Sequence, residues 1–105
     1  MSESLIRGKA WGPADRSGGP LDDVLGGARR ALPGLVVERL QVTRPGDDDN
    51  VYFLRVGSGT GYVQVDSGPL GQAPFTVEGV TRTDTSDPAG ALAAICREFG
   101  GCGDL

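Results

Sequence analysis

Apolar residues recur along this chain with two different periods, and the change of period divides it into elements. Between residues 21 and 32 the apolar positions are spaced three, four and seven apart, which places them on one face of a helix. Pro20 before this stretch and Pro33-Gly34 after it are typical helix boundaries. The pattern predicts a helix whose apolar stripe consists of Leu21, Val24, Leu25, Ala28 and Leu32.

Four runs rich in Val, Leu, Phe and Tyr follow this helix, and Gly- and Pro-containing segments separate them. Alternation within the central pair places Tyr52 and Leu54 on one face, while Val63 points opposite to Tyr62. The glycines of residues 57–61 between these two runs are typical of a hairpin turn. Strands are therefore predicted at residues 35–43, 51–56, 62–66 and 75–80, and residues 4–11 are compatible with a short additional edge strand.

A second helix closes the chain. Thr85-Ser86-Asp87 offers an N-cap, Pro88 suits the first helical position, and Gly100-Gly101 favours a stop. Its apolar stripe consists of Leu92, Ile95, Cys96 and Phe99. We therefore expect a single domain over residues 1–105 in the α+β class. It is a two-layer sandwich in which an N-terminal and a C-terminal helix pack on one face of a four-stranded antiparallel meander.

The candidate chemistry is sparse, because the chain contains no histidine and only two cysteines. Histidine is the commonest general acid and base near neutral pH, and Cys and His supply most transition-metal sites. We therefore expect no enzymatic activity, no metal site and no cofactor. Glu78 is the first acid to examine for catalysis, although an outward-facing strand residue is the simpler interpretation.

The two cysteines, Cys96 and Cys102, are six positions apart. Reducing conditions favour a small core residue at Cys96 and a free thiol at Cys102. A disulfide between them is the alternative, because a chain turning back through Gly100-Gly101 brings the two positions together.

A net charge of −4 and a pI of about 4.6 argue against nucleic acid, which requires clustered Lys and Arg. They favour a cationic protein surface as the partner, although an acidic pI also serves solubility alone. No apolar stretch has the length of a membrane span and no secretory signal precedes the first helix, so we expect a cytoplasmic protein that does not bind membranes.

Asp47-Asp48-Asp49 is the densest charge in the chain and lies in a predicted turn. A calcium loop is not indicated, because its closing glutamate would fall at Ser58. A solvated acidic turn is one interpretation, and a patch that pairs with a cationic partner is the other. Tyr52 and Tyr62 lie on neighbouring predicted strands and are compatible with a cross-strand pair beside the turn, of a residue type common in interface hot spots. Tyrosines that cap the edge of the core are the alternative interpretation. The predicted partner-binding residues are Asp47, Asp48, Asp49, Tyr52, Tyr62 and Asp66.

Four segments resemble small bacterial immunity proteins of polymorphic toxin systems, namely Asp49–Leu54, Gly61–Asp66, Phe75–Gly79 and the closing helix Ala91–Phe99. The resemblance implies an acidic, non-catalytic protein that binds a toxin domain and occludes its active site. It implies that the acidic turn and the tyrosine face form the binding surface. Chains with this order of elements also resemble secretion chaperones, which implies a homodimer that holds a client in an apolar groove as the alternative.

Overall fold

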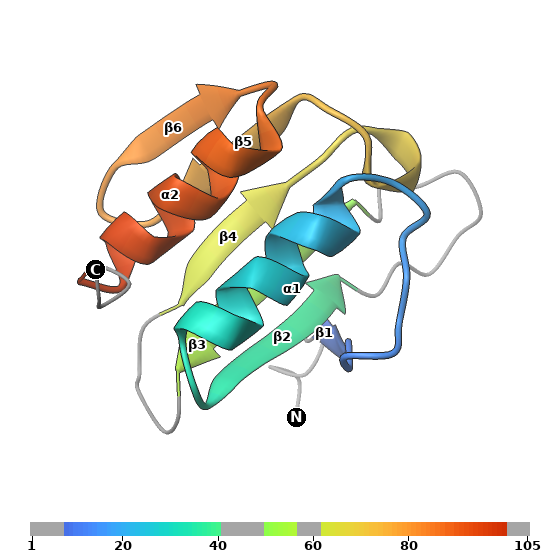
Figure 1. Cartoon of the computed structure of the whole chain (residues 1–105), viewed down its shortest axis with the longest axis horizontal. Helices are drawn as coiled ribbons and strands as arrows, with labels where there is room; N and C mark the ends of the chain where they lie inside the picture. The colour runs from blue at the N-terminus through green and yellow to red at the C-terminus, as the bar shows by residue number, and fades with distance from the viewer. Residues whose placement is uncertain (1–7, 41–49, 57–61, 101–105) are drawn as a thin grey trace, which may run out of the picture.

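Strands that follow one another along this chain also lie next to one another in one antiparallel sheet of order β1-β2-β3-β4-β5-β6. The computed structural model describes residues 8–40, 50–56 and 62–100. Both helices lie on the same face of this sheet, so the fold is α+β with two layers (Figure 1). The elements are β1 (Gly8–Ala10), α1 (Leu21–Ala31), β2 (Leu35–Leu40), β3 (Val51–Val56), β4 (Val63–Asp66), the 3-10 turn η2 (Pro69–Gly71), β5 (Phe75–Glu78), β6 (Arg82–Thr85) and α2 (Pro88–Glu98).

The predicted class and meander are confirmed, but the described residues form a sheet of six strands and not four. The expected meander corresponds to β2 through β5, and β1 lies within the stretch that was compatible with an edge strand. No prediction covered β6, whose sequence Arg-Thr-Asp-Thr contains no apolar residue. It becomes a strand because it pairs with β5, with Thr85 opposite Phe75 and Thr83 opposite Val77. Pairing across a short turn therefore creates a strand where the hydrophobic pattern indicates none.

The core lies between the sheet and the two helices. Alternate residues of each central strand point toward the helices, and the apolar stripes of α1 and α2 cover them. Tyr52, Leu54, Val65 and Phe75 are at most 1% exposed, so β3, β4 and β5 form its centre. No helix in the described ranges is long and apolar enough to cross a membrane.

The two helices pack closely because a glycine lies at their contact. Gly27 is buried in α1, and a Cβ atom there would lie 2.7 Å from Cδ2 of Leu92 in α2. The neighbouring Gly26 has room for a side chain, with only Nη1 of Arg30 at 3.7 Å. A side chain at Gly27 would therefore have to displace the Leu92 methyl group, whereas one at Gly26 would displace nothing.

Two aspartates fix the helix starts. Asp87 is the N-cap of α2 and its carboxylate accepts a 3.2 Å hydrogen bond from the Ala89 N–H. Asp22, in the first turn of α1, accepts from the Ser17 N–H at 2.7 Å and the Gly18 N–H at 3.0 Å. Burial alone raises the pKa of Asp22, but these bonds and that from the Ser17 hydroxyl outweigh it, so the pKa is lowered. The loop before α1 is therefore held to the helix by an ionised carboxylate.

Candidate functional site

The face of the sheet opposite the helices carries outward-pointing side chains that no described helix or strand covers (Figure 1). This surface is called the open face. Its side chains are exposed or half-buried, whereas their sequence neighbours on β3, β4 and β5 are buried. The open face comprises Val36, Glu38, Leu40, Val51, Phe53, Arg55, Gln64, Asp66, Thr76, Glu78, Arg82 and Asp84, with Tyr62 at its end.

An aromatic pair lies on the open face. The rings of Phe53 and Tyr62 meet edge to face, with centroids 5.3 Å apart and an interplanar angle of 81°. Tyr62 is 58% exposed, so most of its ring and hydroxyl face solvent. Tyr62 is thus a predicted partner-binding residue at the surface, on the same face as Asp66.

Tyr52 is not at the surface, and this corrects the prediction that it forms a cross-strand pair with Tyr62. It is 1% exposed beneath the helices and lies opposite Val65 of β4. Its ring meets Trp11 edge to face at 5.5 Å, and the guanidinium of Arg39 lies over both rings. The strand period turns successive side chains to opposite faces, so Phe53 takes the position on the open face that Tyr52 was expected to hold.

Carboxylates occupy the part of the open face formed by β4, β5 and β6. Asp66 lies opposite Thr76, which lies opposite Asp84, so the three form one row across these strands. Asp66 accepts from Gln64 Nε2 at 3.0 Å, and Asp84 accepts from the Thr76 hydroxyl at 2.7 Å. That bond, and then the nearby Arg82, lower the pKa of Asp84. The row therefore presents negative charge at the surface. The other predicted carboxylates, Asp47, Asp48 and Asp49, lie outside the described residues.

A groove of about 540 Å³ continues from the open face around the end of the sheet. Glu98 of α2 forms part of its wall and holds the turn between β5 and β6, because its carboxylate accepts from the Val80 N–H at 2.7 Å and from the Thr81 N–H at 3.2 Å. The Thr81 hydroxyl and then these amides lower the pKa of Glu98. The groove is lined mainly by Val56, Tyr62, Val63, Glu78, Val80 and Phe99.

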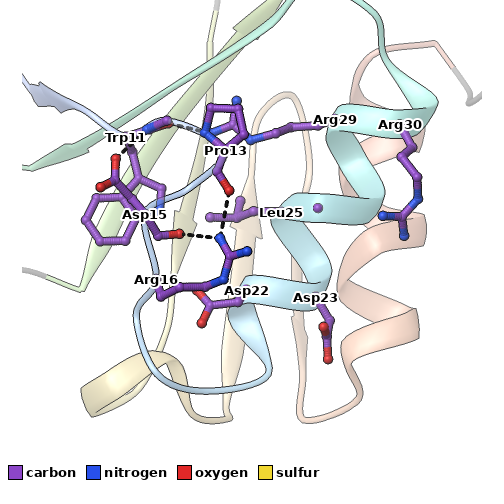
Figure 2. Close-up of a pocket in the computed structure, with 11 residues that line it drawn as sticks. Trp11, Pro13, Asp15, Arg16, Asp22, Asp23, Leu25, Arg29 and Arg30 are labelled. Atoms are coloured by element: carbon purple, nitrogen blue, oxygen red, sulfur yellow. Dashed lines mark hydrogen bonds between the residues drawn. The ribbon is translucent and has the colours of Figure 1, made fainter.

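A second cavity, of about 400 Å³, lies between α1 and the loop of residues 11–16 (Figure 2). Two of the arginines that line it hold the loop in place. Arg16 donates to the carbonyl oxygens of Pro13 and Asp15, and Arg29 donates to the carbonyl oxygen of Trp11. Side chains of both charges line the cavity, so its chemistry selects no class of ligand.

The remaining candidates for chemistry lie apart. Glu78 is exposed on the open face, opposite Gln64 and Arg82 in register. Cys96 is buried, as expected of a core residue, but it is disulfide-bonded, which is the alternative that the sequence left open. Cys102 lies outside the described residues. Across the three described ranges, no three His, Cys, Asp or Glu side chains gather closely enough to hold a metal ion.

The open face contains residues that the sequence-based prediction missed, above all Phe53 and Gln64. Alternation along the hairpin was the signal that could have found them, because Tyr52 shares a face with Leu54 and that face had to be the buried one.

No family model, no curated protein and no solved structure matches this chain.

Proposed function

We propose that this protein is a non-catalytic protein-binding module, an immunity protein that neutralises a cognate toxin domain by covering its active site. The observation that carries the proposal is the open face, where the exposed Tyr62 and the half-buried Phe53 share one surface with the carboxylates of Asp66, Glu78 and Asp84. Aromatic residues within a polar, charged surround are the composition of specific protein interfaces.

The charge of the open face supports a cationic partner. Four carboxylates (Glu38, Asp66, Glu78 and Asp84) stand against two arginines (Arg55 and Arg82), so the face has the same sign as the whole chain. Complementary potentials steer encounter and raise association rates, most strongly at low salt. Many toxin domains that act on nucleic acid or its precursors need positive charge at their active sites. A negative surface that covers such a site competes with the substrate directly.

Genetic context and co-expression test this function. The gene upstream is expected to encode a large secreted protein whose C-terminal domain arrests growth, and co-expression of this chain restores growth. Tyr62→Ala and Asp66→Arg are expected to weaken binding, Tyr62→Ala by about 2 kcal/mol or about 30-fold in Kd if it is a hot spot. Arg30→Asp on the exposed side of α1 is the matched control and leaves binding unchanged. Growth restoration that is indifferent to both open-face variants contradicts the proposal.

Reversal of the charges at Asp47, Asp48 and Asp49 tests the remaining predicted residues. If this acidic turn steers association, the variant lowers the association rate at low salt and the difference shrinks as salt is added. Unchanged association kinetics at low salt remove the turn from the binding surface. Cell fractionation tests the accompanying prediction of a cytoplasmic location.

A chaperone-like homodimer is the second candidate, and the groove at the end of the sheet favours it. Val80 is 95% exposed beside Tyr62 and Phe99, which gives the groove apolar surface for a client segment. In this case Val80→Asp abolishes the suppression of client aggregation, whereas Asp66→Arg does not. A toxin-binding protein shows the opposite dependence.

A further inference from the structure

The outer edge of β6 has main-chain groups that pair with nothing in the described part of the chain. The Gly79 N–H donates to the Thr81 carbonyl at 2.9 Å, so the pair next to the turn is hydrogen-bonded. Bonded and non-bonded pairs alternate in an antiparallel ladder, so Thr83 and Thr85 bond to β5. Arg82 and Asp84 then turn their N–H and C=O groups away from β5, at the edge of the sheet (Figure 1).

We propose that β6 pairs with β6 of a second copy of this chain, which makes a two-fold homodimer with one continuous sheet. The charges of the edge select the register. With Thr83 on the two-fold axis, Arg82 of each copy lies opposite Asp84 of the other, in hydrogen-bonded pairs. Centring the axis on Arg82 or on Asp84 instead places like charges opposite each other, which is unfavourable.

Edge strands commonly carry charge to prevent this kind of pairing. Here Arg82 and Asp84 have opposite signs, lie two residues apart and form a 3.4 Å ion pair within one chain, at side-chain exposures of 60% and 62%. An exposed ion pair of this kind contributes little, so both side chains can exchange it for the same pairing with a second copy. Two positive or two negative residues would repel a second copy, whereas this arrangement attracts one in a single antiparallel register. The edge is thus self-complementary.

Helix α2 supplies an independent observation. Glu98 contacts Val80 and Thr81, and Gly90 lies against Thr85, so α2 runs antiparallel to β6. The middle of the helix, near Ala93, is therefore level with Thr83 and with the two-fold axis. Arg97 reaches the Thr83 hydroxyl at 3.2 Å, so the exposed stripe of Ala89, Ala93 and Arg97 lies on the β6 side of α2.

This stripe has the shape that a second copy requires. Helix α2 contacts β5 and β6 to a similar extent, so its axis lies above the midline between these two strands. The two-fold axis lies half a strand spacing beyond β6, which puts it about one spacing of 4.8 Å from the axis of α2. The two copies of α2 would therefore lie about 10 Å apart. Helices in direct contact have axes 8–10 Å apart, and small residues such as Ala89 and Ala93 permit that approach. The two-fold axis is perpendicular to the sheet, so both open faces stay on the same side and remain free for partners.

Complementary charge reversal tests the dimer by sedimentation velocity at low salt, at protein concentrations up to about 200 μM. Wild type is expected to self-associate. Arg82→Asp and Asp84→Arg each create two like-charge pairs and are expected to raise the Kd at least about tenfold. An equimolar mixture of the two variants restores both opposite-charge pairs and forms a heterodimer, and the double variant homodimerises again.

The mixture also distinguishes a lost contact from a lost fold, because two misfolded chains do not restore association. Arg30→Asp on α1 is the matched control and leaves self-association unchanged. A wild type that is monomeric over the whole range overturns the proposal, as does a mixture that associates no better than each variant alone. Binding of a toxin at the open face is measured with Tyr62→Ala, so failure of the dimer and failure of the proposed function are separable.

Discussion

The two tyrosines of the central hairpin have opposite roles, and replacing each with alanine separates them. Tyr52 is 1% exposed and packs against Trp11, whereas Tyr62 is 58% exposed and contacts Phe53 on the open face. Tyr52→Ala should therefore lower the free energy of unfolding, and Tyr62→Ala should affect partner binding instead.

The magnitudes follow from burial. Truncating a buried aromatic residue to alanine costs about 3–5 kcal/mol, because a cavity remains beside the neighbouring strands. Tyr62→Ala removes less than half as much buried side chain and one aromatic contact, worth about 0.5–1.5 kcal/mol. The free energy of unfolding of a domain of this size is about 5–15 kcal/mol, so Tyr52→Ala removes a large share of the stability.

Urea unfolding followed by circular dichroism measures both values. With a slope of about 1.5 kcal/mol per molar urea, Tyr52→Ala lowers the midpoint by about 2–3 M, and Tyr62→Ala by less than about 1 M. The assignment of the two faces is refuted if the variants shift the midpoint equally, or if Tyr52→Ala leaves it unchanged.

Three further predictions concern the helices and the β5–β6 turn. Gly26→Ala should raise the free energy of unfolding by about 1 kcal/mol, because alanine favours the helix and has room there. Gly27→Ala should lower the free energy of unfolding by about as much, because its Cβ displaces Leu92. Thermal unfolding of the two variants compares these effects. Asp87→Ala should lower the free energy of unfolding by about 1 kcal/mol, because it removes the N-cap of α2. Urea unfolding measures this loss, and an unchanged midpoint contradicts the prediction. The pKa of Glu98 is lowered in the folded protein, so its contribution to stability is complete above the ordinary glutamate pKa and is lost as pH falls through the folded value. Glu98→Gln should flatten this acid-side decline and speed amide exchange at Val80 and Thr81, and a wild-type pH profile in the variant would falsify the contact.

The periodic elements could be predicted because their signals are local. The apolar stripe of α1, the Asp87 cap and the alternation along β3 and β4 each involve residues within a few positions of one another. The same alternation contains enough information to place Phe53 on the open face, once Tyr52 is grouped with Leu54 as buried.

By itself, then, the sequence determined the class of this protein, its two helices, its central meander and its shortage of histidine and cysteine chemistry. Only the tertiary structure decided that Arg82–Thr85 is a strand, that Gly27 packs against Leu92 of the other helix, and that Glu98 holds a turn eighteen positions before it. These features depend on contacts between residues far apart in the chain. A local pattern of polar and apolar residues does not specify such contacts, because it records which face of an element is buried and not which element covers it.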